Sequence, residues 1–340
     1  MLRNIINQHS SKITQPFVQG ASQAMLYAVG LSEEDMDKAQ VGISTVWYEG
    51  NPCNNHLNQL SEIVYNSINH HYTSDMLSFR FNTIGISDGI SMGTSGMRYS
   101  LPSREIIADS IESVMEGQHY DANISIAGCD KNMPGCLIGM LRVDRPGYII
   151  YGGSSPPGMY NNQKVDVVNA FQSYGQYQSG EIDLEERNDI VKSCCPGSGS
   201  CGGMYTANTM AVALEAMGMS QPYDSSNPAL SNAKLNQCKS AGDIIYNLLI
   251  NDIRPSDIVN ERSLTNAIKA GIALGGSTNM VLHILAIAKT LDIDIHQEDF
   301  NNIGDMVPVI GNMKPFGSYL MNDLHHIGGT PLVLKFLMEE

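Results

Sequence analysis

Three cysteines of this 340-residue chain stand where ligand chemistry is expected. Cys53, Cys129 and Cys201 each lie at a predicted turn with glycine or proline nearby, and a predicted helix follows each turn. Turns from strand to helix lie at the carboxyl ends of the strands in open α/β sheets, where ligands bind. Three thiols from separate strand ends could therefore converge on one iron–sulfur cluster and leave an iron position open as a Lewis acid.

The remaining cysteines fit such a site less well. Cys136 falls inside an apolar helical stretch, and nothing in the sequence around Cys194 or Cys238 points to a ligand role. Cys195 lies in the same predicted turn as Cys201 and competes with it for the third position. Zinc is disfavoured, because structural zinc sites mostly use C-x₂₋₄-C pairs and these two cysteines are spaced too widely.

Two carboxylates and a lysine could serve a hard ion. Asp88 and Asp130 both follow predicted strands and could offer oxygen ligands to Mg²⁺, although a lone aspartate there is more often a helix N-cap. Lys131 follows directly. A buried lysine can lose its proton and react with CO₂, and the resulting carbamate would add another oxygen ligand. The turn from Gly128 to Gly135 could thus bind a soft metal and a hard one.

The elements that must position these groups follow from hydrophobic periodicity. Apolar runs predict strands at 41–47, 79–86, 123–127 and 147–151. Helical patterns cover 20–30, the run from 57 to about 70, 103–115, 136–141, 165–179, 184–193, 204–217, 229–250, 263–274, 280–291 and 331–338. Alternation of strands and helices predicts an α/β fold, with a layered parallel sheet and helices on both faces. The loop 90–100 is expected to be functional or mobile, and 275–279 to be a turn between helices.

Composition limits the partners. The formal charge of −15 and the pI near 4.9, without a basic cluster, argue against nucleic acid or an anionic membrane surface. No apolar run is long enough to cross a membrane.

Seven cysteines, an odd number, do not suit a secreted disulfide framework. The first residues lack a secretory signal, so a cytoplasmic location is expected, with an organelle matrix or stroma as the alternative.

Six segments carry long and specific motifs: 51–54, 82–94, 99–110, 128–135, 195–197 and 199–210. Together they resemble the dihydroxy-acid dehydratases of the IlvD/Edd dehydratase family, which also contains sugar-acid and phosphogluconate dehydratases. The resemblance runs from about residue 12 to residue 334. It therefore covers nearly the whole chain.

The resemblance implies a ligand set and a reaction. It implies an iron–sulfur cluster on Cys53, Cys129 and Cys201, of the [2Fe–2S] type with [4Fe–4S] as the alternative. It also implies Mg²⁺ on Asp88, Asp130 and a carbamylated Lys131. Family enzymes are hydro-lyases that remove water from small dihydroxy acids, here 2,3-dihydroxyisovalerate and 2,3-dihydroxy-3-methylvalerate. The products are 2-oxo acids of valine and isoleucine biosynthesis, and a homodimer is implied for the full enzyme.

Family members continue into a second, β-rich domain. By resemblance, that part holds a further Mg²⁺-binding glutamate and the serine thought to remove the substrate proton. Residues 1–340 are therefore expected to be the N-terminal domain, with an arm over about 1–30 and with about 326–340 leading into the second domain. No catalytic base is expected in this chain, and the isolated chain is expected to be inactive.

Two alternatives stay open. One is a sugar-acid or phosphogluconate dehydratase of the same family; the long match over 83–110 favours the branched-chain enzyme. The other is a non-catalytic iron–sulfur or metal-binding module. The activity of the completed protein would separate them.

Overall fold

The centre of the molecule is a four-stranded parallel sheet. The computed structural model describes residues 6–339. The strands lie in the order β2-β1-β3-β4, and their bounds are Met76–Asn82 for β2, Ala39–Thr45 for β1, Ala122–Ala127 for β3 and Gly147–Tyr151 for β4. Every residue of β1, β3 and β4 is buried, as expected for a parallel sheet that is covered on both sides. The predicted α/β class and parallel pairing are confirmed.

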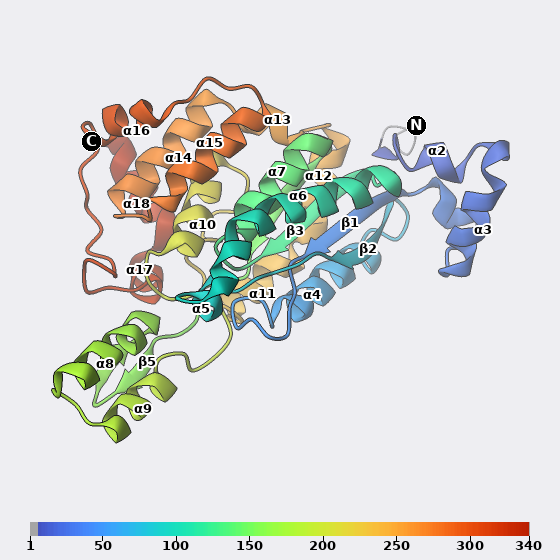
Figure 1. The fold of residues 1–340 in the computed structure, drawn as a ribbon. Helices are drawn as coiled ribbons and strands as arrows, with labels where there is room; N and C mark the ends of the chain where they lie inside the picture. The colour runs from blue at the N-terminus through green and yellow to red at the C-terminus, as the bar shows by residue number, and fades with distance from the viewer. Residues whose placement is uncertain (1–5, 340) are drawn as a thin grey trace.

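Helices cover both faces of this sheet, as predicted (Figure 1). Helix α4 (Leu57–Asn69) packs on β1, β2 and β3, and α12 (Ala241–Ile250) continues the same layer over β3 and β4. On the other face, α7 (Asn132–Val143) packs on β3 and β4 and pairs with α6 (Ser100–Gly117).

Glycines allow the closest of these helix contacts. A Cβ added at Gly135 of α7 would lie 2.8 Å from the carbonyl oxygen of Arg104, and one at Gly139 would lie 2.9 Å from that of Ala108. Such distances are shorter than real Cβ contacts, so the backbones of α6 and α7 meet only because these side chains are absent. The close contact fixes the position of the start of α7, which follows Lys131.

The remaining helices surround this core and extend it. They are α2 (Ser11–Thr14), α3 (Gly20–Ala28), α5 (Asp88–Ser91), α8 (Val167–Ser179), α9 (Leu184–Ser193), α10 (Thr206–Met217), α11 (Asn232–Lys239), α13 (Pro255–Ile258), α14 (Glu261–Ala273), α15 (Asn279–Thr290), α16 (Gln297–Gly304), α17 (Met321–Ile327) and α18 (Gly329–Glu339). Short 3₁₀ turns are η1 (Phe17–Gln19), η2 (Glu34–Asp37) and η3 (Ser95–Tyr99).

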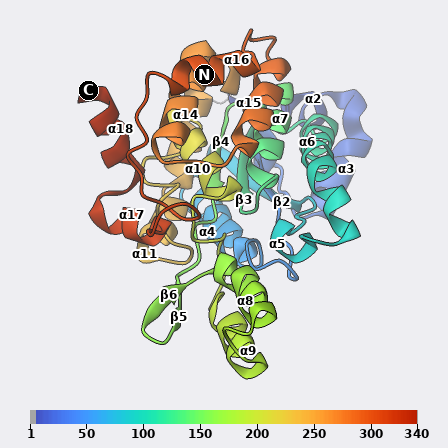
Figure 2. The same ribbon diagram turned by 60° about the vertical axis from the view of Figure 1, so that its left-hand side comes forward.

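A small lobe projects from the sheet domain. It consists of α8, α9 and an antiparallel hairpin of β5 (Gly158–Tyr160) and β6 (Gln163–Val165) (Figure 2). Helices α2 and α3 extend at the opposite end, and no residue of α3 is buried. At the other terminus α18 packs on α10 and α14. The expected bounds of the N-terminal arm and of the lead into a second domain stay predictions.

Several predicted elements were wrong in extent. Strand β2 ends at Asn82 and not at residue 86, because its partner β1 ends at Thr45, which is paired with Asn82. The single helix predicted over 229–250 is two helices, which meet where Gly242 approaches the backbone of Ser67. The loop over 90–100 contains the end of α5 and all of η3. Helix α7 begins before Cys136, and α13, α16, α17 and the β5–β6 hairpin were not predicted.

The strand order reverses between β1 and β3. Helix α4 connects β1 to β2 on one face, and α7 connects β3 to β4 on the other. In doubly wound sheets, the crevice at such a reversal, beyond the carboxyl ends of the strands, is where ligands bind. The turns that contain Cys53 and Cys129 lie at this place. No helix among residues 6–339 is long and apolar enough to cross a bilayer.

A buried ion pair connects α11 to the sheet. The Lys234 ammonium lies 2.6 Å from Asp224 Oδ1, and the two side chains are 0% and 1% exposed. Asp224 Oδ2 accepts a 2.7 Å hydrogen bond from the backbone N–H of Tyr151, the last residue of β4. The pair therefore fixes the segment after α10 against the carboxyl end of the sheet.

Replacing Lys234 with methionine should destabilise the chain strongly. The substitution leaves the Asp224 carboxylate buried without its partner, which typically costs about 3–5 kcal/mol. We expect a clearly lower midpoint of thermal unfolding by circular dichroism. Lys289→Met is the matched control, because the Lys289–Asp292 pair is 84% and 87% exposed and should contribute almost nothing. Equal effects of the two substitutions would contradict this account.

Candidate functional site

The structure brings the three predicted cysteines together. Cys53 follows β1, Cys129 follows β3 and Cys201 precedes α10, yet the Cys53 side chain contacts the other two thiols. Cys53 and Cys129 are buried, whereas Cys201 is partly exposed. The predicted convergence of three strand-end thiols is thus present in the fold. Their role as iron ligands stays a prediction.

Hydrogen bonds between the turns hold the three cysteines in this arrangement. The backbone N–H of Gly199 donates to the carbonyl oxygen of Pro52 at 2.9 Å, and Ser200 Oγ donates to the carbonyl oxygen of Gly128 at 2.5 Å. Pro52 directly precedes Cys53, and Gly128 directly precedes Cys129. Each hydrogen bond therefore links one of these two turns to the turn of Cys201. The third turn is therefore attached to both of the others.

The third turn also extends the sheet beyond β4. Ser200 forms a parallel bridge with Ser154, in which Ser155 N–H donates to Ser200 O at 2.7 Å and Ser200 N–H donates to Gly153 O at 2.9 Å. Gly199 adopts φ +122°, and a Cβ there would lie 2.5 Å from the Ser155 nitrogen. Only glycine fits such a conformation at such a distance.

Cys195 was the competitor for the third position. It lines the same cavity but is exposed, and the contacts of the Cys53 thiol are with Cys129 and Cys201. The pKa of Cys195 is raised to about 11. The larger cause is partial burial of its thiol, and the next is the charge of the nearby Cys201. The geometry favours Cys201 as the third member of the thiol group.

The pKa of Cys53 is raised well above its ordinary range. The causes are the contacts with the thiols of Cys129 and Cys201, followed by burial. Metal ions bind thiolates and not thiols, so uptake of a metal here must release protons.

Asp88 and Lys131 form a buried pair beside the thiols. Lys131 Nζ lies 2.6 Å from Asp88 Oδ2 and 3.9 Å from Asp130 Oδ2, and Ser100 Oγ donates to Asp88 Oδ1 at 2.7 Å. Asp88 is not an N-cap: Ser87 caps α5, and its hydroxyl accepts from the N–H of Ile90. A role of Asp88 as the N-cap of this helix is therefore excluded.

Asp130 is partly exposed and lies next to this pair. Burial and the negative charge of Asp88 raise the pKa of Asp130 to about 6, while Lys131 and the hydroxyl of Thr206 lower it. A cation between the two carboxylates would relieve the repulsion that Asp88 exerts on the charged form of Asp130. The group is thus suited to a hard ion.

A cavity of about 550 Å³ joins the two groups. One side of it presents Cys53, Asp88, Cys129, Asp130 and Cys201. Apolar residues form much of the rest of the wall, among them Ile90, Met92, Val167, Val168, Phe171 and Phe316. Helices α10 and α15 begin at the cavity, at Thr206 and Asn279. Their N-terminal ends favour a negatively charged ligand.

Two parts of this wall were missed from the sequence. The segment 275–279 was predicted only as a turn between helices, but it lines the cavity, and Asn279 Nδ2 donates to Thr206 Oγ1 at 2.8 Å. Its small residues before a helix start were the available signal. Val167, Val168 and Phe171 of α8 gave no signal, because an apolar helix face usually faces a core.

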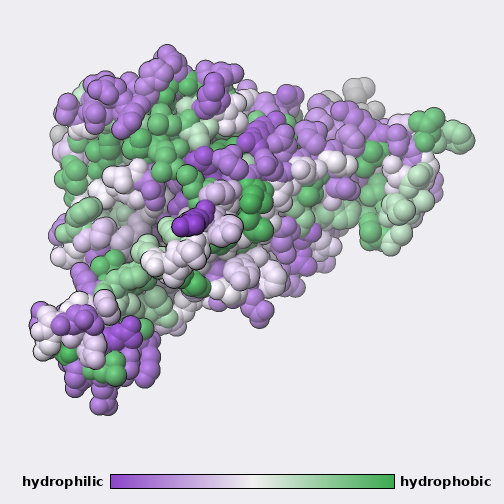
Figure 3. Space-filling model, viewed as in Figure 1, coloured by the Kyte–Doolittle hydropathy of each residue, from purple (hydrophilic) through white to green (hydrophobic). Residues whose placement is uncertain are grey.

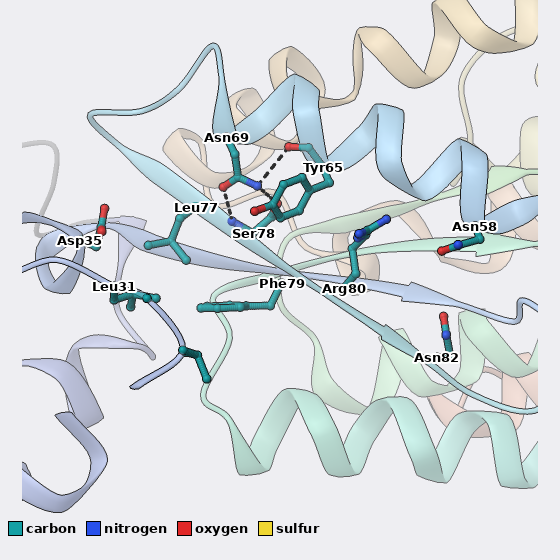
Figure 4. A pocket seen from close by; sticks show the side chains of 12 residues that line it. Leu31, Asp35, Asn58, Tyr65, Asn69, Leu77, Ser78, Phe79, Arg80 and Asn82 are labelled. Atoms are coloured by element: carbon teal, nitrogen blue, oxygen red, sulfur yellow. Dashed lines mark hydrogen bonds between the residues drawn. The ribbon is translucent and has the colours of Figure 1, made fainter. Parts of the chain in front are cut away.

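Another cavity of about 550 Å³ lies at the other end of the domain, between β2, α4 and residues 29–35 (Figure 4). Arg80 lies over the ring of Tyr65 at 5.3 Å, and Asn69 bonds to Tyr65 and Ser78. Its lining includes no cysteine and no lysine. None of the predicted site residues lines this second cavity.

The donors around the thiol cavity fit two different metal groups. Three thiols are soft donors, as iron–sulfur clusters require, and two carboxylates are hard donors, as Mg²⁺ requires. Among residues 6–339, no three His, Cys, Asp or Glu side chains are arranged to hold one metal ion. A cluster spreads its thiolates over several iron atoms, and a carbamate on Lys131 would add the missing oxygen to the carboxylate group.

Gly128 should tolerate no side chain. A Cβ there would overlap the carbonyl oxygen of Cys53 and the side-chain oxygen of Asn54. We expect Gly128→Ala to lower the stability of the metal-free chain by about 1–3 kcal/mol, measured by thermal unfolding. Gly117→Ala is the control: a Cβ at Gly117, in α6, has no neighbour within 4 Å, so a small gain is expected. If both chains melt alike, the turn is less tightly packed than described.

Comparison with known proteins is consistent with this geometry. The chain is 54% identical over 336 residues to the chloroplastic dihydroxy-acid dehydratase of Arabidopsis thaliana, and covers 55% of it. It is 56% identical over 338 residues to the mitochondrial dihydroxy-acid dehydratase of Schizosaccharomyces pombe, and covers 56% of it. It is 52% identical over 338 residues to the dihydroxy-acid dehydratase of Francisella tularensis subsp. novicida, and covers 60% of it.

These alignments include 98–99% of this chain, which spans a little more than half the length of these curated relatives. Residues 38–340 match the family described as dihydroxy-acid/6-phosphogluconate dehydratase, N-terminal. The chain therefore belongs to the dihydroxy-acid/6-phosphogluconate dehydratase family and contains its N-terminal region.

Proposed function

We propose that this chain is the cluster- and Mg²⁺-binding part of a dihydroxy-acid dehydratase, a hydro-lyase of branched-chain amino-acid biosynthesis. The observation that supports the proposal is that the thiols of Cys53, Cys129 and Cys201 line one cavity with Asp88 and Asp130, and that Asp88 is paired with the buried Lys131. Relatives at 52–56% identity bear the dihydroxy-acid dehydratase name.

The proposed ligands are those that the family resemblance implies, and their donor types support them. Cys53, Cys129 and Cys201 would hold the cluster, [2Fe–2S] or [4Fe–4S], and Asp88, Asp130 and Lys131 as its carbamate would hold Mg²⁺. When bound, these groups supply Lewis acids that favour loss of a hydroxyl group from a 2,3-dihydroxy acid. The Lys131 ammonium forms an ion pair with Asp88. A carbamate on Lys131 would be negatively charged, so this ion pair would be lost and both groups would instead bind the same cation.

The chain's own residues would bind and orient the substrate. The starts of α10 and α15 face the cavity and suit the carboxylate of a dihydroxy acid. The apolar wall, with Val168, Phe171 and Phe316, suits a branched alkyl group. A sugar acid would place hydroxyl groups against that wall without hydrogen-bond partners, which is costly. The wall thus favours the branched-chain substrate over the sugar-acid alternative.

We also propose a homodimer for the complete enzyme. Phe17, Val18, Met25 and Val29 are strongly exposed around α3, and Figure 3 shows apolar surface at this end of the molecule. A subunit contact would cover them. Light scattering that returned the mass of one chain for the complete protein would contradict the dimer.

The compartment is proposed to be the cytoplasm, or an organelle matrix or stroma. The names of the relatives include mitochondrial and chloroplastic proteins as well as a bacterial one without such a label. Fractionation of the source cells would distinguish these locations.

The cluster assignment predicts a pattern in metal content. Anaerobically reconstituted wild-type chain should contain iron and acid-labile sulfide and absorb visible light, and Cys53→Ser, Cys129→Ser and Cys201→Ser should each lose most of both. Cys238→Ser is the matched control, because Cys238 is buried like Cys53 and Cys129 but belongs to the hydrophobic core. Full loading of any of the three serine variants would remove that residue from the ligand set.

The reaction is tested on a completed protein. The chain alone should form no 2-oxo acid from 2,3-dihydroxyisovalerate, because loss of a general base costs about 10²–10⁴-fold or more. The chain joined to the remaining part of the Arabidopsis relative should be active, and its Lys131→Met variant should not. Faster turnover of a sugar acid than of the branched-chain acid would favour the alternative function, and activity of the chain alone would contradict its proposed dependence on another part.

A further inference from the structure

Buried asparagines contact the backbone of each cysteine turn. The side-chain oxygen of Asn51 accepts a 3.0 Å hydrogen bond from the N–H of Cys53. The side-chain oxygen of Asn132 accepts a 2.7 Å hydrogen bond from the N–H of Cys129. Both asparagines are fully buried. The backbone positions of two of the thiols are thus fixed by carboxamides.

Asn208 does the same for the third thiol. Its side-chain nitrogen donates to the carbonyl oxygens of Cys201 at 2.7 Å and Gly203 at 2.6 Å. Carbonyl oxygens only accept, so the nitrogen must face them and the amide oxygen must face the hydroxyl of Tyr151, 2.7 Å away. That hydroxyl therefore donates, and it fixes the orientation of the amide.

A fourth asparagine joins two of the turns. Asn54, next to Cys53, donates through its side-chain nitrogen to the side-chain oxygen of Asn132 at 3.0 Å and to the carbonyl oxygen of Val46 at 2.8 Å. One oxygen of Asn132 thus accepts both from the turn of Cys129 and from the turn of Cys53. The end of β1 is held by the same amide.

We propose that Asn51, Asn54, Asn132 and Asn208, here called the asparagine frame, hold the three thiols in ligating positions before any cofactor is bound. The inference rests on the proposed function, because it takes Cys53, Cys129 and Cys201 as the ligand set. The asparagines are positioning residues: they bind the backbone of the cysteine turns, not the metal. Cluster insertion is then a late step, into a domain that is already folded.

The asparagine frame would act by preorganising the cysteine turns. Three separate turns would otherwise lose conformational entropy when a cluster orders them, and this loss would weaken binding. In the frame the cost is met during folding by buried hydrogen bonds. Replacing Asn132 with alanine would leave two buried donors, the Cys129 N–H and an Asn54 N–H, without their acceptor.

The test uses the reduced, metal-free chain and dibromobimane, which joins two neighbouring thiols. Cross-linked peptides are identified by mass spectrometry. Asn132→Ala should lower the yield of the Cys53–Cys129 cross-link about tenfold, the order expected when two buried donors lose their shared acceptor oxygen. Asn132→Asp keeps an acceptor oxygen and should restore the yield.

Two further variants separate positioning from general stability. Asn123→Ala is the matched control, because Asn123 is as deeply buried in β3 but bonds to Gly42 and Ser44 within the sheet. It should lower the melting temperature without changing the cross-link. Tyr151→Phe leaves the buried side-chain oxygen of Asn208 without its donor and so weakens the placement of this amide; it should reduce the Cys53–Cys201 cross-link and leave Cys53–Cys129 unchanged.

The outcomes distinguish the frame from the proposed function. Equal cross-link yields for Asn132→Ala and Asn123→Ala, at matched fractions of folded chain, would overturn the frame. So would a Tyr151→Phe variant that affects both cross-links equally. If the cross-links behave as expected but the wild-type chain takes up no cluster, the frame stands and the cofactor assignment is wrong.

Discussion

The reversal of strand order between β1 and β3 is the constraint on which the site depends. Because α4 and α7 leave the sheet on opposite faces, a crevice opens where β1 and β3 end side by side. Cys53 and Cys129 occupy the two turns at this crevice. The third turn reaches it by pairing Ser200 with Ser154 beyond the end of β4. One feature of the sheet thus explains how cysteines that are 148 positions apart in the chain (201 − 53) meet.

Charge is arranged in two different ways around this crevice. Lys131 and Asp88 form a buried ion pair near the cavity. Lys234 and Asp224 form another buried ion pair, at the carboxyl end of β4. This second pair has a backbone partner as well and is structural. Asp88 of the first pair lines the cavity beside a second carboxylate, Asp130, whose pKa is raised to about 6 mainly by burial and by the charge of Asp88. The two carboxylates at the cavity are therefore balanced by only one lysine, which is the basis for proposing that a cation binds there.

Much of the fold and part of the site could be predicted from the sequence. Strands β1, β3 and β4 read clearly because buried parallel strands are continuous apolar runs, and the turns of Cys53 and Cys129 followed from them. Spacing alone left Cys195 and Cys201 open, and only the family resemblance implied Cys201, because the position of that thiol depends on Ser200 pairing with the sheet. The contributions of Phe171 and of residues 275–279 were missed because local sequence does not reveal which distant element faces a helix. The asparagines were missed because a buried polar residue is recognised only by its partners.

The lobe of α8 and α9 has a consequence for how this architecture can change. It is inserted between the end of β4 and the turn of Cys201, two points that are themselves held together by the Ser154–Ser200 bridge. Its side chains form a wall of the cavity but contribute none of the predicted ligands. Substitutions in the lobe can therefore reshape the space for the substrate while the thiols and carboxylates keep their places. Divergence of substrate choice within such a lineage would then need no new metal chemistry.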